Sequence, residues 1–174
     1  MIQGTQKMNE KALTGFHKNQ LFCQTLNTPL GKMFVEASSY GLTQVGWGEN
    51  EHSEMANNHT QKGVLWLNRY FEKNDTEMLA FDTRSLTIFQ KSVLLKLNTS
   101  KFGSVMSYGE LASKANSPGA SRAVGSVMAM NPWPIIVPCH RVVRYDGIIG
   151  NYSGVGGKTT KEWLLNHERI ESEN

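Results

Sequence analysis

A cysteine and a histidine stand side by side in the segment PIIVPCHRVV, residues 134–143. A thiol is a weak nucleophile until it loses its proton, at a free pKa of about 8.5. His140 can accept that proton from Cys139, directly or through a water molecule, while a carboxylate orients the imidazole. Three glutamates are candidates for that carboxylate, and their spacing does not choose among them: Glu110, Glu162 and Glu168. The pair therefore indicates nucleophilic chemistry.

The flanks of this pair constrain it. Apolar residues at 135–137 and 142–143 predict a buried strand where the pair lies. Prolines 132, 134 and 138 restrict the backbone, and the side-chain amide of Asn131 can hold the turn that precedes them. Such constraint is typical of a site held in fixed geometry.

A thiol hydrolase is one function that uses a Cys–His pair, and it would turn over many substrates. Neighbouring residues of a strand point to opposite faces of the sheet, which is poor geometry for a direct contact between Cys139 and His140. This geometry therefore argues against a thiol hydrolase.

A second candidate site lies before this pair. Residues 107–115 and 120–130 predict two short helices joined by Asn-Ser-Pro-Gly, which is a helix-turn-helix or an ordinary helical hairpin. The outward face of the second helix carries one long cation among small residues: Arg122, Gly125, Ser126 and Ala129. Small residues allow a close approach to the DNA minor groove, which is about 6 Å wide. One arginine can then fill the gap left by an extruded base, although close helix packing also favours small residues.

The elements that must position these residues form two units. Alternating apolar residues predict antiparallel strands at about 20–26, 32–38 and 41–47, followed by an amphipathic helix that ends near Asn74. Residues 76–83 predict one further short strand. We therefore expect a small α+β domain at residues 20–83, preceded by a flexible tail at residues 1–19.

The second expected domain, residues 84–174, is mostly helical. Helices are predicted at 86–99, 107–115, 120–130 and from 159 to about 169, and Ser107 with Glu110 forms a capping box. The fold class is thus α+β, with a helix-turn-helix in the C-terminal domain.

Composition narrows the function classes. The chain has 174 residues, two cysteines and five scattered histidines, so we expect reduced thiols inside the cell and no structural metal. Residues 1–83 hold 7 Lys/Arg and 9 Asp/Glu, a net charge of −2; residues 84–174 hold 11 and 6, a net charge of +5. This asymmetry hints at a polyanionic partner for the second half. No secretion signal or membrane span is legible, which fits the nucleus or the cytoplasm.

These motifs together resemble the O6-alkylguanine-DNA alkyltransferase family. The resemblance covers about residues 86–169 through ordered segments: FGSVMSYGELA, SRAVGSVMAMNPWP, PIIVPCHRVV, GIIGNYSG and KEWLLNHE. The first half matches loosely, mainly in WLNRYF. The resemblance implies a monomer that binds double-stranded DNA containing O6-alkylguanine, flips out the damaged base and transfers its alkyl group permanently to a cysteine, without a cofactor.

The resemblance also implies roles at the reacting centre. Cys139 is the alkyl acceptor, and His140 acts as a base through a bound water molecule. Glu168 orients His140, and Tyr108 donates a proton to the departing guanine.

Further implied roles concern DNA and the flipped base. Arg122 is the intercalating finger, among DNA-contacting residues that the helix supplies: Ala120, Ser121, Gly125 and Ser126. Asn131 is the hinge between that helix and the active-site turn. The flipped base lies against Tyr152 and Ser153, the carbonyls of Cys139 and Val142 accept from its amino group, and Arg141 is anchored to the protein's own backbone.

The sequence departs from the family pattern in three places. The loop after Ser153 is about two residues longer than usual, Ala129 replaces an arginine of some members, and the first half lacks the cysteine pair of zinc-binding members. A DNA-lesion sensor of the same fold, which does not transfer the alkyl group, is the alternative function. Such relatives lack the acceptor cysteine, so Cys139 argues against it.

Overall fold

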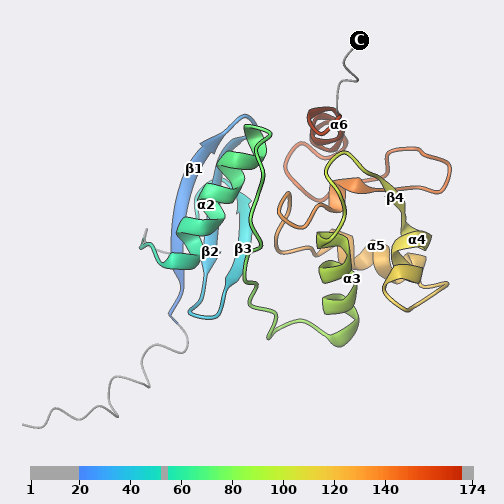
Figure 1. The fold of residues 1–174 in the computed structure, drawn as a ribbon, viewed down its shortest axis with the longest axis horizontal. Helices are drawn as coiled ribbons and strands as arrows, with labels where there is room; N and C mark the ends of the chain where they lie inside the picture. Colours follow the sequence, from blue (N-terminus) through green and yellow to red (C-terminus); the bar gives the residue numbers. More distant parts are fainter. Residues whose placement is uncertain (1–19, 52–54, 170–174) are drawn as a thin grey trace, which may run out of the picture.

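The computed structural model describes residues 20–51 and 55–169. An antiparallel sheet and one helix form the N-terminal half, and the C-terminal half is mainly helical (Figure 1). The predicted α+β class is therefore confirmed. The expected tail, residues 1–19, lies outside the described residues.

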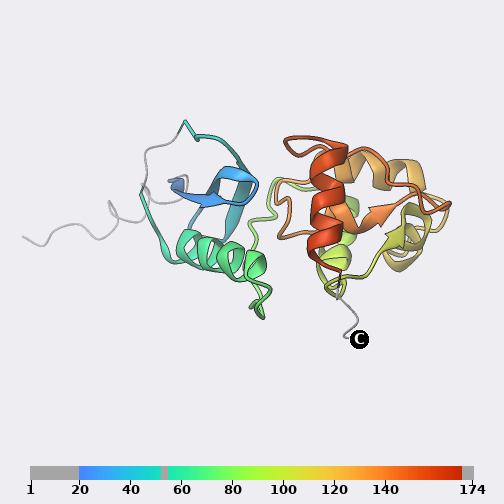
Figure 2. The same cartoon turned by 90° about the horizontal axis from the view of Figure 1, so that it is seen from above.

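The N-terminal sheet has the strand order β1-β2-β3, with β1 at Phe22–Thr28, β2 at Gly31–Ala37 and β3 at Leu42–Trp47. Helix α2, Asn58–Phe71, covers one face of this sheet (Figures 1 and 2). Its approach is close, because a Cβ on Gly63 would lie 2.7 Å from Val35 Cγ1.

The prediction of a strand at residues 76–83 is wrong. Phe81 makes only an isolated bridge with Leu42. The Leu42 amide donates to Ala80 O at 2.9 Å, and the Asp82 amide donates to Leu42 O at 2.8 Å. The segment thus touches the start of β3 without extending along it.

The C-terminal half contains the predicted helices. They are α3 at Ile88–Asn98, α4 at Tyr108–Lys114, α5 at Ser121–Ala129 and α6 at Lys158–His167. The capping box of α4 is present, with the Ser107 side chain accepting from the Glu110 amide and Glu110 accepting from the Ser107 amide. A short parallel pair joins β4, Met106–Ser107, to β5, Val142–Val143.

The buried strand predicted before the Cys–His pair is also wrong. Residues 135–137 are buried but lie in a turn, with Ile135 at φ 72° and the Val137 amide donating to Trp133 O at 2.8 Å. Cys139 and His140 belong to a short 3-10 helix, Cys139–Arg141. Prolines at 132, 134 and 138 explain the difference, because each removes a backbone donor that a strand ladder needs.

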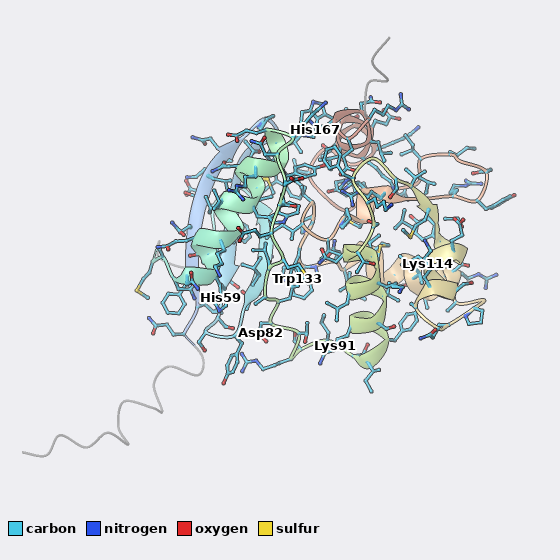
Figure 3. The ribbon with its side chains drawn as sticks, in the orientation of Figure 1. His59, Asp82, Lys91, Lys114, Trp133 and His167 are labelled. Atoms are coloured by element: carbon cyan, nitrogen blue, oxygen red, sulfur yellow. The ribbon has the colours of Figure 1, made fainter. Side chains whose placement is uncertain are left out.

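One hydrophobic core runs through both halves, including Leu42 of the sheet and Leu111 of α4. Trp133 lies between β3 and α3 (Figure 3), and its indole donates to Leu42 O at 3.0 Å. The Val45 amide donates to Pro132 O at 2.8 Å. The sheet is therefore bonded directly to the turn that leads to Cys139. Among the described residues, no helix is long and apolar enough to cross a membrane.

Candidate active site

Cys139 lies at a cavity of about 480 Å³ in the C-terminal half. Only 3% of Cys139 is exposed. The cavity is walled by the start of α4, by α5 and by the loop before α6: Tyr108, Gly125, Met128, Tyr152 and Ser153. Three segments that are distant in sequence thus enclose one thiol.

Asn131 holds the turn that carries the thiol. Its side-chain amide donates to Val137 O at 2.8 Å, and its side-chain oxygen accepts from the Trp133 amide at 3.0 Å. Burial raises the pKa of the Cys139 thiol, while a hydrogen bond from Asn131 and the charge of Lys161 lower it only in part. The net pKa is raised, so this thiol needs a base to become a thiolate.

The candidate base for the Cys139 thiol is the next residue, His140. His140 Nε2 lies 2.6 Å from Glu168 Oε1, and both side chains are buried. Burial lowers the pKa of His140, and the neighbouring Glu168 charge only partly opposes this effect. The carboxylate only accepts hydrogen bonds, so the neutral imidazole carries its proton on Nε2. Nδ1, which has no hydrogen-bond partner among the described residues, is then the basic nitrogen.

Glu168 is surrounded by donors. Oε1 also accepts from Tyr70 Oη at 2.8 Å, and Oε2 accepts from the Gly103 amide at 3.1 Å and from Arg141 Nε at 2.7 Å. Burial raises the pKa of Glu168, but the hydrogen bonds from His140 and Arg141 outweigh it and lower the pKa to about 2. The carboxylate is therefore charged at neutral pH. Of the three candidate glutamates, the structure brings only this one to His140.

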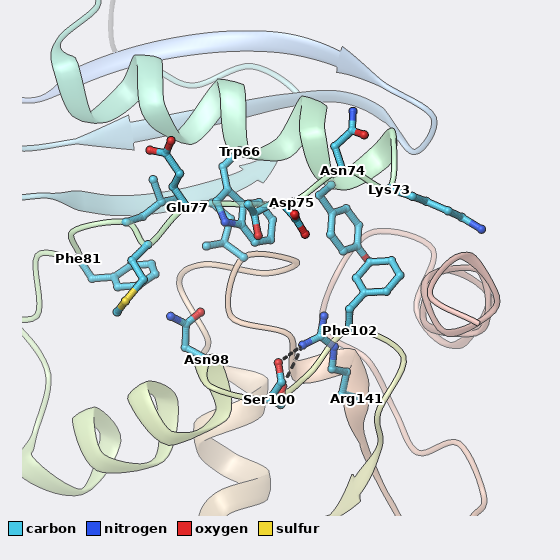
Figure 4. Close-up of a pocket in the computed structure, with 15 residues that line it drawn as sticks. Trp66, Lys73, Asn74, Asp75, Glu77, Phe81, Asn98, Ser100, Phe102 and Arg141 are labelled. Carbon is cyan, nitrogen blue, oxygen red and sulfur yellow. Dashed lines mark hydrogen bonds between the residues drawn. The ribbon is translucent and has the colours of Figure 1, made fainter. Parts of the chain in front are cut away.

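The expectation for Arg141 was incomplete. Its Nη1 does donate to Ser100 O, at 2.7 Å, as a backbone anchor (Figure 4). Its Nε and Nη2 also form a bidentate pair with Glu168, at 2.7 and 3.0 Å. Arg141 thus belongs to the cluster that holds the base.

Tyr70 was missed by sequence reasoning as a site residue. It lies 98 positions from Glu168, in the N-terminal half, and reaches the carboxylate from α2. The only signal was its place in WLNRYF, the part of the first half that resembles the family.

Tyr108 lines the cavity from the first position of α4. Burial raises its pKa, and a charge on Cys139 raises it further. A Cβ on Gly150 would lie 3.4 Å from its hydroxyl oxygen, so the loop before α6 passes close to this group. A phenol that retains its proton beside a thiolate is suited to donate that proton to a leaving group.

Val142 O already has a donor in the structure. Lys161 Nζ donates to it at 2.6 Å, although Lys161 is almost fully buried. Burial lowers the pKa of Lys161, and a charge on Cys139 opposes this effect. Sequence reasoning missed this lysine. A carbonyl has two lone pairs, so Val142 O can accept one further donor.

Helix α5 presents the expected face to solvent. Arg122, Ser126 and Ala129 are exposed, whereas Val124, Val127 and Met128 are buried. At its start, Ser121 is half-buried and Ala120 packs partly against the core. Ala120, Ser121 and Gly125 are thus less exposed than Arg122 and Ser126.

Tyr152 and Ser153 line the cavity from the loop that precedes α6. The Tyr152 hydroxyl is buried without a hydrogen-bond partner among the described residues, and burial raises its pKa well above the usual range. The loop turns at Gly156 and Gly157, with φ of 78° and 54°. A side chain at Gly156 would collide with Thr160 Oγ1, so the extended loop requires glycine there.

A second cavity, of about 330 Å³, lies between α2 and the C-terminal half (Figure 4). Its lining includes Trp66, Tyr70, Phe102 and Arg141, but not Cys139. In the part of the chain that the structure describes, no group of three or more His, Cys, Asp or Glu side chains could hold a metal ion.

Comparison with known proteins agrees with this geometry. Residues 21–82 match the ribonuclease-like domain of 6-O-methylguanine DNA methyltransferase, and residues 88–170 match the DNA binding domain of the same family. The methylated-DNA–protein-cysteine methyltransferase of Rattus norvegicus is 52% identical over 169 residues, covering 83% of this chain and 80% of the rat protein. The Homo sapiens protein of that name is 38% identical over 164 residues, covering 83% and 78%.

Solved structures show the same likeness. The Mycobacterium tuberculosis O6-methylguanine methyltransferase aligns with a TM-score of 0.74 at 32% identity, covering 88% of this chain and 97% of that one. The M. tuberculosis OGT in complex with DNA aligns with a TM-score of 0.73 at 35% identity, covering 84% and 92%. The fold, the enclosed thiol and these matches place the chain in the 6-O-methylguanine DNA methyltransferase family.

Proposed function

We propose that the chain repairs DNA directly, by transferring an alkyl group from O6 of guanine to Cys139, once per molecule. The observation that carries this proposal is a buried thiol on a cavity of about 480 Å³, next to a histidine that a buried carboxylate keeps oriented. Binding pockets for small ligands are typically about 300–1,000 Å³. The names of the rat and human relatives support the same activity.

The proposed reaction is one displacement. His140 takes the thiol proton through a water molecule, and the thiolate attacks the alkyl carbon. A carbon–sulfur bond forms as the carbon–O6 bond breaks, and the electron pair of that bond stays with guanine. Tyr108 protonates the departing base, and the proton on His140 restores the tyrosine through solvent. The thioether is stable, so the protein does not turn over.

The proposal for DNA rests on α5 and its surroundings. Helices α4 and α5 act as a helix-turn-helix at the minor groove, with Gly125 and Ser126 permitting close approach and Arg122 replacing the extruded base. Asn131 joins this helix to the thiol. The flipped guanine lies against Tyr152 and Ser153, and its amino group donates to the carbonyls of Cys139 and Val142.

The domain organisation is part of the proposal. Residues 20–83 and 84–174 form two domains that share one core, and the chain acts as a monomer in the nucleus or the cytoplasm. The alkyl group that leaves guanine becomes bonded to the sulfur of Cys139, so the proposed reaction needs no cofactor.

Intact-mass measurement tests this function. After incubation with excess duplex containing O6-methylguanine, we expect one added methyl per molecule, located on Cys139 by peptide mapping. Cys139→Ala is expected to bind the same duplex and to gain no methyl. Repair of more lesions than protein molecules, or methylation of Cys139→Ala, would refute the proposal.

The same experiment addresses the lesion sensor. Burial raises the pKa of the Cys139 thiol, and a thiol that kept its proton would bind the lesion without reacting. Tight binding of the lesion with an unmodified Cys139 would favour the sensor.

A further inference from the structure

Tyr70 connects the N-terminal half to the proposed base. It is 2% exposed, and its hydroxyl donates to Glu168 Oε1 at 2.8 Å. Its ring meets the His140 ring edge-on at 6.5 Å, and its carbonyl oxygen lies 3.1 Å from His167 Nε2. The ring also stacks on Trp66 at 5.5 Å, so the hydroxyl is held from several sides.

We propose that Tyr70 is a positioning residue of the reaction, and that its hydroxyl fixes the Glu168 carboxylate so that the N-terminal half sets the strength of His140 as a base. This inference deepens the proposed function and rests on it.

The physical argument concerns one oxygen atom. Glu168 Oε1 accepts from His140 Nε2 at 2.6 Å, from Tyr70 Oη at 2.8 Å and from Arg141 Nη2 at 3.0 Å. Donors that share one oxygen compete for the negative charge of that oxygen. Each donor therefore weakens the hydrogen bonds that the oxygen accepts from the other donors. Without the tyrosine donor, Oε1 would bind the imidazolium form of His140 more strongly. The base would then protonate at a higher pH and be lost sooner as the pH falls.

Packing alone does not explain this hydroxyl. A phenylalanine would keep the ring contacts with Trp66 and His140, whereas a buried hydroxyl costs free energy unless it is bonded. Other ionisable groups act on this cluster from neighbouring elements: Arg141, Lys161, His167 and Tyr152. Those groups stay in place in a Tyr70→Phe variant, so a change in pH dependence reports the hydroxyl.

The test compares Tyr70→Phe with the wild type in the full chain. The rate of single methyl transfer from an O6-methylguanine duplex is measured across the pH range in which imidazole titrates. We expect an acid limb moved up by about one pH unit, transfer up to about tenfold slower on that limb, and rates that converge at higher pH.

Trp66→Phe is the matched control, because Trp66 stacks on Tyr70 and, in the part of the chain that the structure describes, forms no hydrogen bond with Glu168. It is expected to leave the acid limb in place. Three results would overturn the inference. They are a transfer rate in Tyr70→Phe equal to that of the wild type, a loss of rate in Tyr70→Phe that is the same at every pH, and the same shift of the acid limb in Trp66→Phe.

A second arm separates this inference from the proposed function. Iodoacetamide alkylation of Cys139, followed by peptide mapping, reports the same base without DNA. A wild type that fails to accept methyl from the lesion would refute the function. A Tyr70→Phe pH profile identical to that of the wild type in the iodoacetamide arm would refute the positioning role.

Discussion

At the scale of single residues, one carboxylate serves two purposes. Glu168 orients His140 and neutralises Arg141, with all three side chains buried. Charge at Glu168 is stabilised by its donors, while burial keeps His140 neutral. The opposite directions of these two effects leave a base beside a permanent anion, which is the arrangement that proton transfer from a buried thiol requires.

Replacement of Glu168 by glutamine is expected to destabilise the protein in a pH-dependent way. The folded pKa is about 2, against an ordinary value of 4.5. A depressed pKa contributes stability above the ordinary value, and that stability is lost as the pH falls from 4.5 towards 2. We expect Glu168→Gln to lower the free energy of unfolding by about 3 kcal/mol at neutral pH, and by progressively less below pH 4.5.

Urea denaturation followed by tryptophan fluorescence at several pH values measures this difference. Glu162→Gln is the control, since the Glu162 side chain is half-exposed and, among the described residues, forms an ion pair with Lys158 alone, at 3.6 Å. A destabilisation equal in the two variants, or one that does not shrink on acidification, would contradict the linkage.

At the scale of elements, α5 divides its two faces between the core and the outside. Its buried side carries Val124, Val127 and Met128, and its other side carries small residues around Arg122. Gly125 also lines the cavity with Tyr108, so this helix forms part of both the outer surface and the thiol pocket. A single element can thereby couple contact with DNA to access to Cys139.

Arg122→Ala is expected to slow transfer from duplex DNA by roughly tenfold to a hundredfold, because the proposed role of the arginine is to offset unstacking of a few kcal/mol. Reaction with free O6-benzylguanine is expected to change little, since no base must be extruded. Intact-mass kinetics with the two substrates gives the comparison.

Lys62→Ala removes one positive charge at an exposed position of α2 and controls for the change in net charge. Equal slowing of both substrates by Arg122→Ala would remove the base-flipping role from this residue.

At the scale of the whole molecule, the two halves behave as one folded unit. Trp133 is 1% exposed and joins the active-site turn to the sheet through Leu42 O. The hydrogen bond between Tyr70 and Glu168 is another link between the two halves. A shared core with several polar links between the halves predicts cooperative unfolding.

Trp133→Phe removes the indole donor and part of a packed ring, while Leu42 O keeps its bond from the Asp82 amide. We expect the free energy of unfolding to fall by about 2 kcal/mol, and Tm by roughly 4–8 °C, with a single transition retained. Differential scanning calorimetry measures both quantities. Trp163→Phe, at a residue 36% exposed, is expected to change Tm less. Two separate transitions in either protein would argue against one cooperative unit.

The sequence by itself determined the elements whose signals are local. Apolar periodicity and the Ser107–Glu110 cap were sufficient for the helices, and the alternation at residues 20–47 was sufficient for the sheet. It also determined the thiol, its neighbouring histidine and the small face of α5, because these depend on residue types within one segment.

Only the tertiary structure decided how distant segments meet. It showed a proline-constrained turn where a strand was expected at 135–137, and it placed against His140 the Glu168 that the family resemblance had implied. It also brought Tyr70 and Lys161 to the centre. These outcomes depend on contacts between residues far apart in the chain, and periodicity within a segment carries no information about such contacts. The physical reason is that a buried hydroxyl, ammonium or carboxylate takes whichever partner the packed core places within hydrogen-bond distance.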